Sequence, residues 1–123
     1  MATEFKRLTM GDVPNTALPN TSDGTSDLYT VPSNCDTVII GLLLTNISAG
    51  AIVVDALIEV QSGQGEDVYL LKNANVPYGS ALEIISGKVI VANTGSGVGD
   101  TVQVRCQTGT AHLDATISIL ENT

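Results

Sequence analysis

Two long apolar runs, separated by a short polar turn, occupy residues 36–61 and constrain the fold more than any other part of the chain. Both runs are rich in β-branched residues, which favour strands, and residues 46–50 between them are suited to a reversal. In the second run Asp55 and Glu59 share one parity. The residues expected to face inward have the other parity: Ile52, Val54, Ala56, Ile58 and Val60. The stretch therefore predicts a central β-hairpin whose second strand alternates between core and solvent.

The first run is apolar on both faces and needs a cover on each. One face is expected to carry Val38, Ile40, Leu42 and Leu44. The opposite face carries Ile39, Leu43 and Ile47, while Val53 and Leu57 lie on the outward parity of the neighbouring strand. Contiguous apolar patches on soluble proteins usually mark interfaces. We therefore expect the last five residues to pack on copies of the same chain or on a second sheet.

Helical interpretations of this stretch fit less well. A membrane-spanning helix needs roughly 20 predominantly apolar residues, and the stretch is long enough. It contains Asn46, Gly50, Asp55 and Glu59, however, and charges at bilayer depth are costly. In a buried helix the two acidic residues would be surrounded by apolar residues on every helical face. Strands are the better interpretation.

Composition favours one globular β domain. The chain of 123 residues is long enough to bury a core without metal ions or disulfides. Hydrophobic residues make up 43% and charged residues only 15%, which excludes disorder over most of the length. The surface must then consist mainly of Thr, Ser, Asn and Gly, as in sandwiches with many turns.

Short strand-like segments at roughly ten-residue spacing extend this interpretation to the whole chain. The further expected strands cover residues 3–9, 27–31, 67–74, 81–85, 88–92, 100–108 and 113–119. Ser86 and Gly87 are expected to join two of them as a hairpin loop. The sequence predicts an all-β, antiparallel β-sandwich of eight or nine strands, jelly-roll-like, over residues 26–123. Residues 1–25, rich in Asn, Pro and Thr, are expected to form an extended N-terminal arm or loop.

Chemistry-bearing residues are sparse, and we predict no catalytic, cofactor-binding or metal-binding residue. The single histidine, His112, has the outward parity of the last strand, and the Gly-rich residues 93–99 lack the Lys and helix of a phosphate loop. One His and two Cys residues are fewer than the four protein ligands of a typical structural zinc site. Cys35 and Cys106 are interpreted as thiols, with a bridge between them left open.

Charge and aromatic content limit the classes of partner. The net charge of −8, with five basic residues, argues against binding to nucleic acid or to an anionic membrane. Four aromatic residues and no Trp offer little surface for stacking on sugars. Residues 1–13 contain no apolar leader, so we expect synthesis and assembly inside a cell.

Several short segments resemble small virion proteins of tailed bacteriophages in their order and spacing. They are residues 29–32, 45–50, 69–74, 76–77, 82–83, 99–104 and 118–121, and they span most of the chain. The resemblance implies a non-enzymatic capsid decoration or cement protein that binds the outer capsid surface as an oligomer, often a trimer, and stabilises the head. Its partners would be copies of itself and the major capsid protein or another virion protein. A tail, neck or fibre component is the alternative, and a carbohydrate-binding β-sandwich module is a more distant one.

The N-terminal arm suggests how such a protein docks. Phe5, Lys6, Arg7 and Leu8 form a short strand-like segment within the arm. An extended segment of this kind adds a strand to the sheet of a neighbour by β-augmentation. We therefore expect these four residues to belong to the interface.

Overall fold

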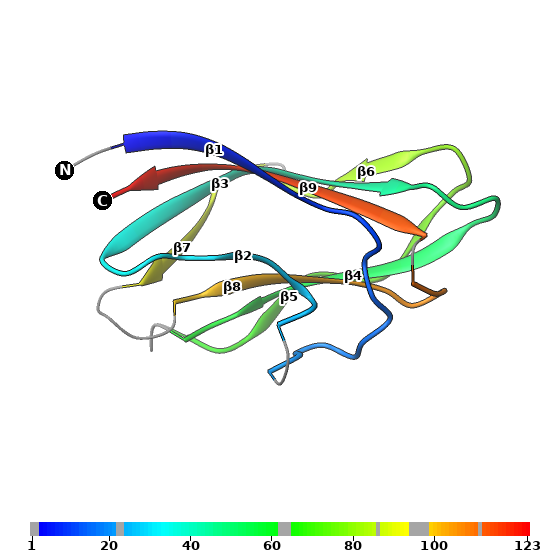
Figure 1. Cartoon of the computed structure of the whole chain (residues 1–123), viewed down its shortest axis with the longest axis horizontal. Coiled ribbons are helices and arrows are strands. Elements are labelled where there is room, and N and C mark those ends of the chain that lie inside the picture. The colour runs from blue at the N-terminus through cyan, green and yellow to red at the C-terminus, as the bar shows by residue number, and fades with distance from the viewer. Residues whose placement is uncertain (1–2, 22–23, 62–64, 86, 94–98, 111) are drawn as a thin grey trace.

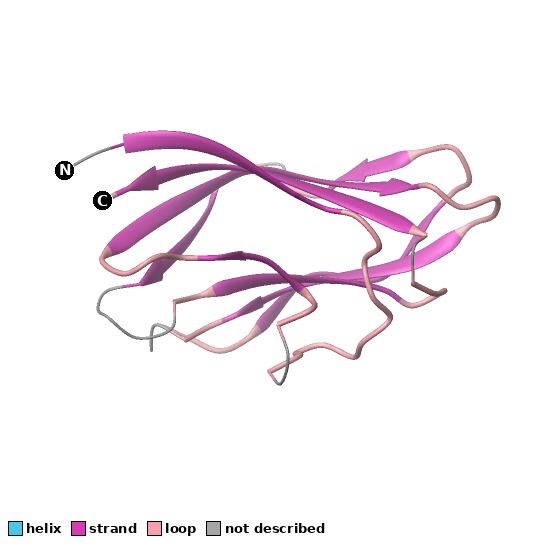
Figure 2. Cartoon of the chain, viewed as in Figure 1, coloured by secondary structure: helices cyan, strands magenta, loops and turns pink. Residues whose placement is uncertain are grey.

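The computed structural model describes residues 3–21, 24–61, 65–85, 87–93, 99–110 and 112–123. These residues form nine strands and no helix (Figure 2). The strands are β1 (Thr3–Met10), β2 (Asp27–Thr30), β3 (Cys35–Asn46), β4 (Ile52–Glu59), β5 (Val68–Val76), β6 (Ala81–Glu83), β7 (Val89–Asn93), β8 (Thr101–Cys106) and β9 (Leu113–Asn122). Within this part of the chain, no helical segment has the length and apolarity needed to cross a bilayer.

The strands form two antiparallel sheets that pack face to face (Figure 1). Sheet A has the order β1-β9-β3-β6, and β7 also pairs with β3. Sheet B has the order β2-β8-β4-β5. The all-β sandwich expected from the sequence is confirmed, whereas the jelly-roll connectivity and the extended N-terminal arm are not confirmed and stay predictions.

The core lies between the sheets and uses the positions expected from alternation in three strands. The buried inward residues are Ile52, Val54, Ala56 and Ile58 of β4, Val102, Val104 and Cys106 of β8, and Leu113, Ala115, Ile117 and Ile119 of β9. Alternation succeeds here because each of these strands keeps one face toward the opposite sheet along its length.

The predicted hairpin between the two central runs is wrong, because β3 belongs to sheet A and β4 to sheet B. Residues 47–51 instead carry the chain from one sheet to the other. The Asn46 side chain holds this crossing: its amide donates to the carbonyls of Gly50 at 2.8 Å and Val76 at 2.9 Å. Its oxygen accepts the N–H of Ser48 at 2.8 Å. Because the two apolar strands lie in opposite sheets, their apolar faces pack against each other. In a hairpin the two strands would lie side by side in one sheet, and their faces could not do so.

A β-bulge at Ile40 changes the inward parity of β3. Ile39 pairs with Ile119, but Gly41 pairs with Ser118, so Ile40 is an extra residue. Odd positions face the core before the bulge and even positions after it. As a result Ile39 is buried and Ile40 is 44% exposed, the reverse of the expected assignment.

The predicted hairpin between residues 81–85 and 88–92 is also wrong. β7 pairs with residues 35–39 of β3 and β6 with residues 43–45, while β9 occupies the other edge. β6 and β7 are therefore two pieces of one interrupted edge strand. Near the interruption the Glu83 carboxylate accepts the Leu42 N–H at 3.1 Å, and Ser86 lies outside the described residues.

Residues 15–21 run across the outer face of sheet B (Figure 1), after Val13 has been buried in the core. The Gln103 amide of β8 holds this segment through the backbone of Asn20: its oxygen accepts the N–H at 3.0 Å, and its nitrogen donates to the carbonyl at 2.7 Å. The Tyr69 hydroxyl donates to the carbonyl of Leu18 at 3.1 Å. This part of the predicted arm is a cover for the sheet.

This cover explains why the outward parity of β4 is buried. Leu57 lies in the sheet between Gln103 and Tyr69, beneath the segment, and is buried, as are Asp55 and Glu59. The expectation that these two acidic residues face solvent is therefore wrong. A bulge in β5 leaves the backbone N–H of Asn73 without a partner in the ladder, and the Asp55 carboxylate accepts it at 2.7 Å. The same carboxylate accepts two hydrogen bonds from the side-chain amide of Gln107, at 2.8 and 3.0 Å.

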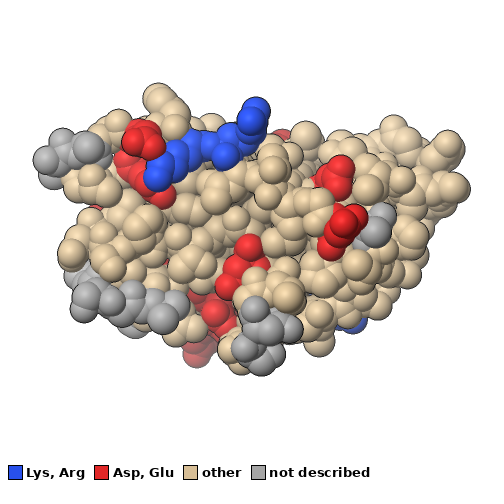
Figure 3. Space-filling view, viewed as in Figure 1, with Lys and Arg blue, Asp and Glu red and all other residues tan. Residues whose placement is uncertain are grey.

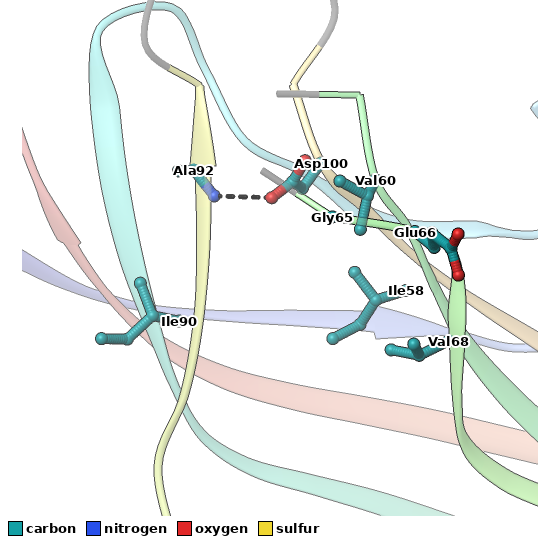
Figure 4. A pocket seen from close by; sticks show the side chains of 8 residues that line it. All are labelled: Ile58, Val60, Gly65, Glu66, Val68, Ile90, Ala92 and Asp100. Carbon is teal, nitrogen blue, oxygen red and sulfur yellow. Dashed lines mark hydrogen bonds between the residues drawn. The ribbon is translucent and has the colours of Figure 1, made fainter. Parts of the chain in front are cut away.

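The start of β8 is tied to sheet A. The Asp100 carboxylate accepts the backbone N–H of Ala92 at 3.0 Å (Figure 4). It also accepts the backbone N–H of Gln61 at 2.9 Å. The preceding Gly99 lies against the carbonyl of Val31, so a Cβ at this position would clash with that backbone oxygen. The close approach requires glycine for steric reasons.

We expect Gly99→Ala to lower the free energy of unfolding by about 1–3 kcal/mol or more, because backbone must move to admit the methyl group. Gly50→Ala is the matched control, since a Cβ there meets no atom within 4 Å. The control should be neutral or stabilising by up to about 1 kcal/mol. Urea unfolding followed by circular dichroism measures both, and equal stabilities of the two variants would contradict the steric argument.

We expect Gln103→Ala to lower the free energy of unfolding by about 2 kcal/mol, because it leaves buried backbone groups of Asn20 unsatisfied. Hydrogen exchange measured by mass spectrometry should speed up in residues 15–21. Ser118→Ala, on an exposed position of β9, should leave exchange there unchanged. Unaltered protection in Gln103→Ala would show that the segment is held by other contacts.

Candidate interaction surface

An apolar row crosses the outer face of sheet A. The register places Phe5 opposite Leu120, Leu120 opposite Val38, and Val38 opposite Ile90, across β1, β9, β3 and β7. Phe5 is 75% exposed and Ile90 69% exposed, whereas the two middle residues are half-buried. Neighbouring strands lie about 4.8 Å apart, so the row spans roughly 15 Å.

Two further exposed residues of β3, Ile40 and Leu43, enlarge the row. The sheet A patch, as we name it, comprises Phe5, Val38, Ile40, Leu43, Ile90 and Leu120. Polar residues surround it, among them Arg7, Asp36, Glu83, Thr116 and Ser118. An apolar centre with a polar rim is the usual anatomy of a protein interface.

The patch predicted from the sequence does not form as expected. Ile39 is buried in the core, and Leu57 is buried beneath residues 15–21. Val53 is half-buried on sheet B, and Ile47 is exposed in the crossing after β3. Of the five residues, only Leu43 lies in the sheet A patch. The others were grouped with it because β3 and β4 were assumed to be neighbours in one sheet.

The four N-terminal residues expected at the interface lie in β1, paired with β9 of their own chain. Phe5 and Arg7 face outward with the sheet A patch, while Leu8 packs against the core and Lys6 points toward Glu121. The largest basic cluster in Figure 3 lies along β1, beside acidic residues. No strand of the described chain pairs with the other edge of β1.

A partly buried polar network closes the end of the sandwich where the termini lie (Figure 1). Lys6 Nζ is 2.8 Å from Glu121, and the Tyr29 hydroxyl donates to the same carboxylate at 2.6 Å. The Thr37 hydroxyl is 2.8 Å from that of Tyr29. The network joins β1 and β9 of sheet A to β2 of sheet B.

The network shifts three pKa values. Burial raises the pKa of Glu121, but hydrogen bonds from Lys6 and Tyr29 and the charge of Lys6 outweigh it, so the pKa lies below its ordinary value. The hydrogen bond to Glu121 raises the pKa of Lys6. Burial, and then the bond to Glu121, raise the pKa of Tyr29 well above its ordinary value. At neutral pH the network therefore holds one ammonium, one carboxylate and one neutral phenol.

A pocket of about 340 Å³ opens between β7 and the β4–β5 side of sheet B (Figure 4). Its apolar lining comes from Ile58, Val60, Val68, Ile90 and Ala92. Asp100 also lines it, but its carboxylate already accepts two backbone N–H groups. The arrangement anchors a loop, and the described part of the chain contains no cluster of potential metal ligands.

The other candidate reactive residues lie apart. Cys35 and Cys106 are both buried and free, one in each sheet. His112 is half-buried just before β9, where its ring packs over Gly109. The structure brings none of these three side chains together.

Sequence reasoning missed four residues of the sheet A patch: Val38, Ile40, Ile90 and Leu120. The first two were expected on the face opposite the predicted interface, because the bulge was not visible in the pattern. Leu120 did carry a signal, since it follows Asp114, Thr116 and Ser118 on the outward parity of β9. An apolar residue among outward-facing polar residues of a strand indicates a position that is covered by another surface.

The chain matches no protein-family model, no curated protein and no solved structure. The likeness to phage virion proteins therefore rests on the short segments quoted above. The function has to be argued from the surface itself.

Glu121→Gln should lower the free energy of unfolding at pH 7 by about 1.5 kcal/mol or more, because hydrogen bonds to a charged group are lost. Because the folded-state pKa of Glu121 is depressed, its contribution is present above the unfolded-state pKa and is lost as pH falls through the folded-state value. The gap between wild type and variant should therefore close under acid conditions. Glu66→Gln, at an exposed residue outside the network, is the control. Urea unfolding across the acid range measures this, and a gap that widens toward low pH would contradict it.

Proposed function

We propose that this protein is a non-enzymatic structural subunit of a bacteriophage virion, a decoration or cement protein that binds the outer capsid surface and stabilises the head. The sheet A patch is the observation that carries this proposal. It presents apolar side chains from four strands on one open sheet face, whereas residues 15–21 run across the outer face of sheet B.

The energetics of the patch favour docking against another protein surface. Burying the side chains of Phe5 and Ile90 is worth about 1.5–3 kcal/mol each. Association costs at least about 4 kcal/mol in lost freedom of motion, so the neighbouring Ile40, Leu43 and polar rim are needed for a stable complex. A rigid sheet presents these residues without further ordering, which keeps that cost low.

The order of the strands supports the jelly-roll part of the proposal. The sheets have the orders β1-β9-β3-β6/β7 and β2-β8-β4-β5, and the chain crosses between them at every connection except β4–β5 and β6–β7. The first strand of each sheet lies beside a strand from the end of the chain. We infer a jelly roll of eight strands, with β6 and β7 as the two pieces of one strand. Jelly rolls are frequent among viral capsid proteins, but they also serve as lectins and cupins, so the fold alone does not decide the function.

The binding experiment uses particles that lack the protein and purified wild type or variants. Ile90→Asp should weaken binding by at least about tenfold, because it removes apolar area and places a charge in the contact. Tyr78→Asp is the matched control, since Tyr78 is 70% exposed and lies in the turn after β5, outside the patch. Circular dichroism of both should match wild type. Equal binding by the two variants would remove the patch from the contact.

Copy number separates the proposal from its alternatives. Gel densitometry of purified particles should show this protein near the abundance of the major capsid protein. About a dozen copies or fewer would assign it to the neck or tail instead. Binding to a glycan array without binding to particles would favour a carbohydrate-binding module.

A further inference from the structure

The free edge of β1 differs from the other three sheet edges. β2 has four residues, β6 and β7 are interrupted, and the register of β5 against β4 shifts twice. Short, broken or bulged edges are ways in which proteins prevent strand pairing between molecules. β1 has eight residues in unbroken register with β9, and no described strand covers its other side (Figure 1).

We propose that β1 pairs antiparallel with β1 of a second copy, around a twofold axis that places Phe5 opposite Phe5 of that copy. This inference rests on the proposed function, because it identifies the contact through which the structural subunit associates with itself. It joins the two copies of sheet A into one continuous sheet.

Backbone geometry limits the registers available to this contact. In antiparallel pairs, opposed residues either exchange hydrogen bonds or both point away from each other. Alternate residues of β1 already direct their backbone groups at β9. Opposed residues of two copies must therefore share parity, so the axis has to pass through a residue and not between two residues.

Charge then selects among the remaining registers. An axis through Glu4, Lys6 or Arg7 sets like charges against each other, which is destabilising. An axis through Leu8 places Lys6 opposite Met10 and leaves Phe5 unpaired. An axis through Phe5 places Glu4 opposite Lys6 of the second copy, and Lys6 opposite its Glu4. Of these registers it alone gives two opposite-charge pairs.

The same register continues the apolar row across the contact. In each copy Phe5 is the end of a row that runs through Leu120 and Val38 to Ile90. Opposing the two Phe5 side chains joins both rows into one band of eight residues and buries the most exposed member of each. The paired molecules would offer a capsid a surface twice as wide as one copy does.

A twofold contact of this kind closes after two copies. Native mass spectrometry of the wild-type protein should therefore show a species of twice the chain mass of 12.7 kDa. The trimer suggested by the family resemblance requires a different, heterologous contact. A monomer at micromolar concentration, or a trimer, would overturn the inference.

Cysteine cross-linking tests the register directly. Phe5→Cys places two thiols directly opposite each other, and mild oxidation should give a covalent dimer on a non-reducing gel. Arg7→Cys is the matched control on the same strand and face, with its thiols about 13 Å apart along the strand in this register. The native Cys35 and Cys106 are buried and should not react. Equal cross-linking of both variants, or of neither, would refute the register.

Charge reversal gives an independent measurement. Glu4→Lys sets Lys against Lys on both sides of the axis and should weaken the dimer about tenfold. Glu66→Lys, an exposed residue outside β1, makes the same change in net charge and should leave the dimer intact. Equal weakening by both would indicate a nonspecific charge effect and count against the pairing.

The inference and the proposed function can fail separately. A dimer that does not bind particles would retain the β1 contact and refute the virion role. A monomer that binds particles would retain the virion role and refute the contact.

Discussion

The amide of Gln103 holding the backbone of Asn20 is the interaction on which the arrangement of surfaces depends. It binds residues 15–21 to the outer face of sheet B, over the buried Leu57. A side-chain amide has one acceptor and donors, so it can bond both the C=O and the N–H of a single residue, as the backbone of a neighbouring strand would. The segment is therefore held to the face of the sheet without becoming part of it. One sheet is thereby covered on both faces, and the other keeps one face open.

The bulge in β3 decides which apolar residues of this strand lie on the open face of sheet A. The extra residue at Ile40 reverses the parity of the strand, so that Ile40 and Leu43 point outward while Ile39 and Leu42 point inward. On the side of β3 that faces away from β9, the pairing is interrupted next to the bulge, between β6 and β7. A strand that is apolar on both faces thus serves the core and the surface at once.

Three buried carboxylates hold separate parts of the chain in place. Asp55, Asp100 and Glu121 are buried, and each accepts hydrogen bonds from groups that the ladders leave free or from another sheet. Buried carboxylates are tolerated because these donors replace water. Along β1 the alternation of Glu4 and Lys6 discriminates between possible pairings of the exposed edge.

The sequence by itself determined the all-β class, the approximate positions of the strands and the inward residues of β4, β8 and β9. These follow from local alternation, which a strand keeps wherever one of its faces meets a core. Of the nine residues that the sequence indicated for an interface, Phe5 and Leu43 are exposed apolar residues of the sheet A patch. Only the tertiary structure decided that β3 and β4 lie in different sheets, that Ile40 is a bulge, and that residues 15–21 cover Leu57. Those features depend on contacts between residues far apart in the chain, such as Gln103 with Asn20, and no local pattern records them.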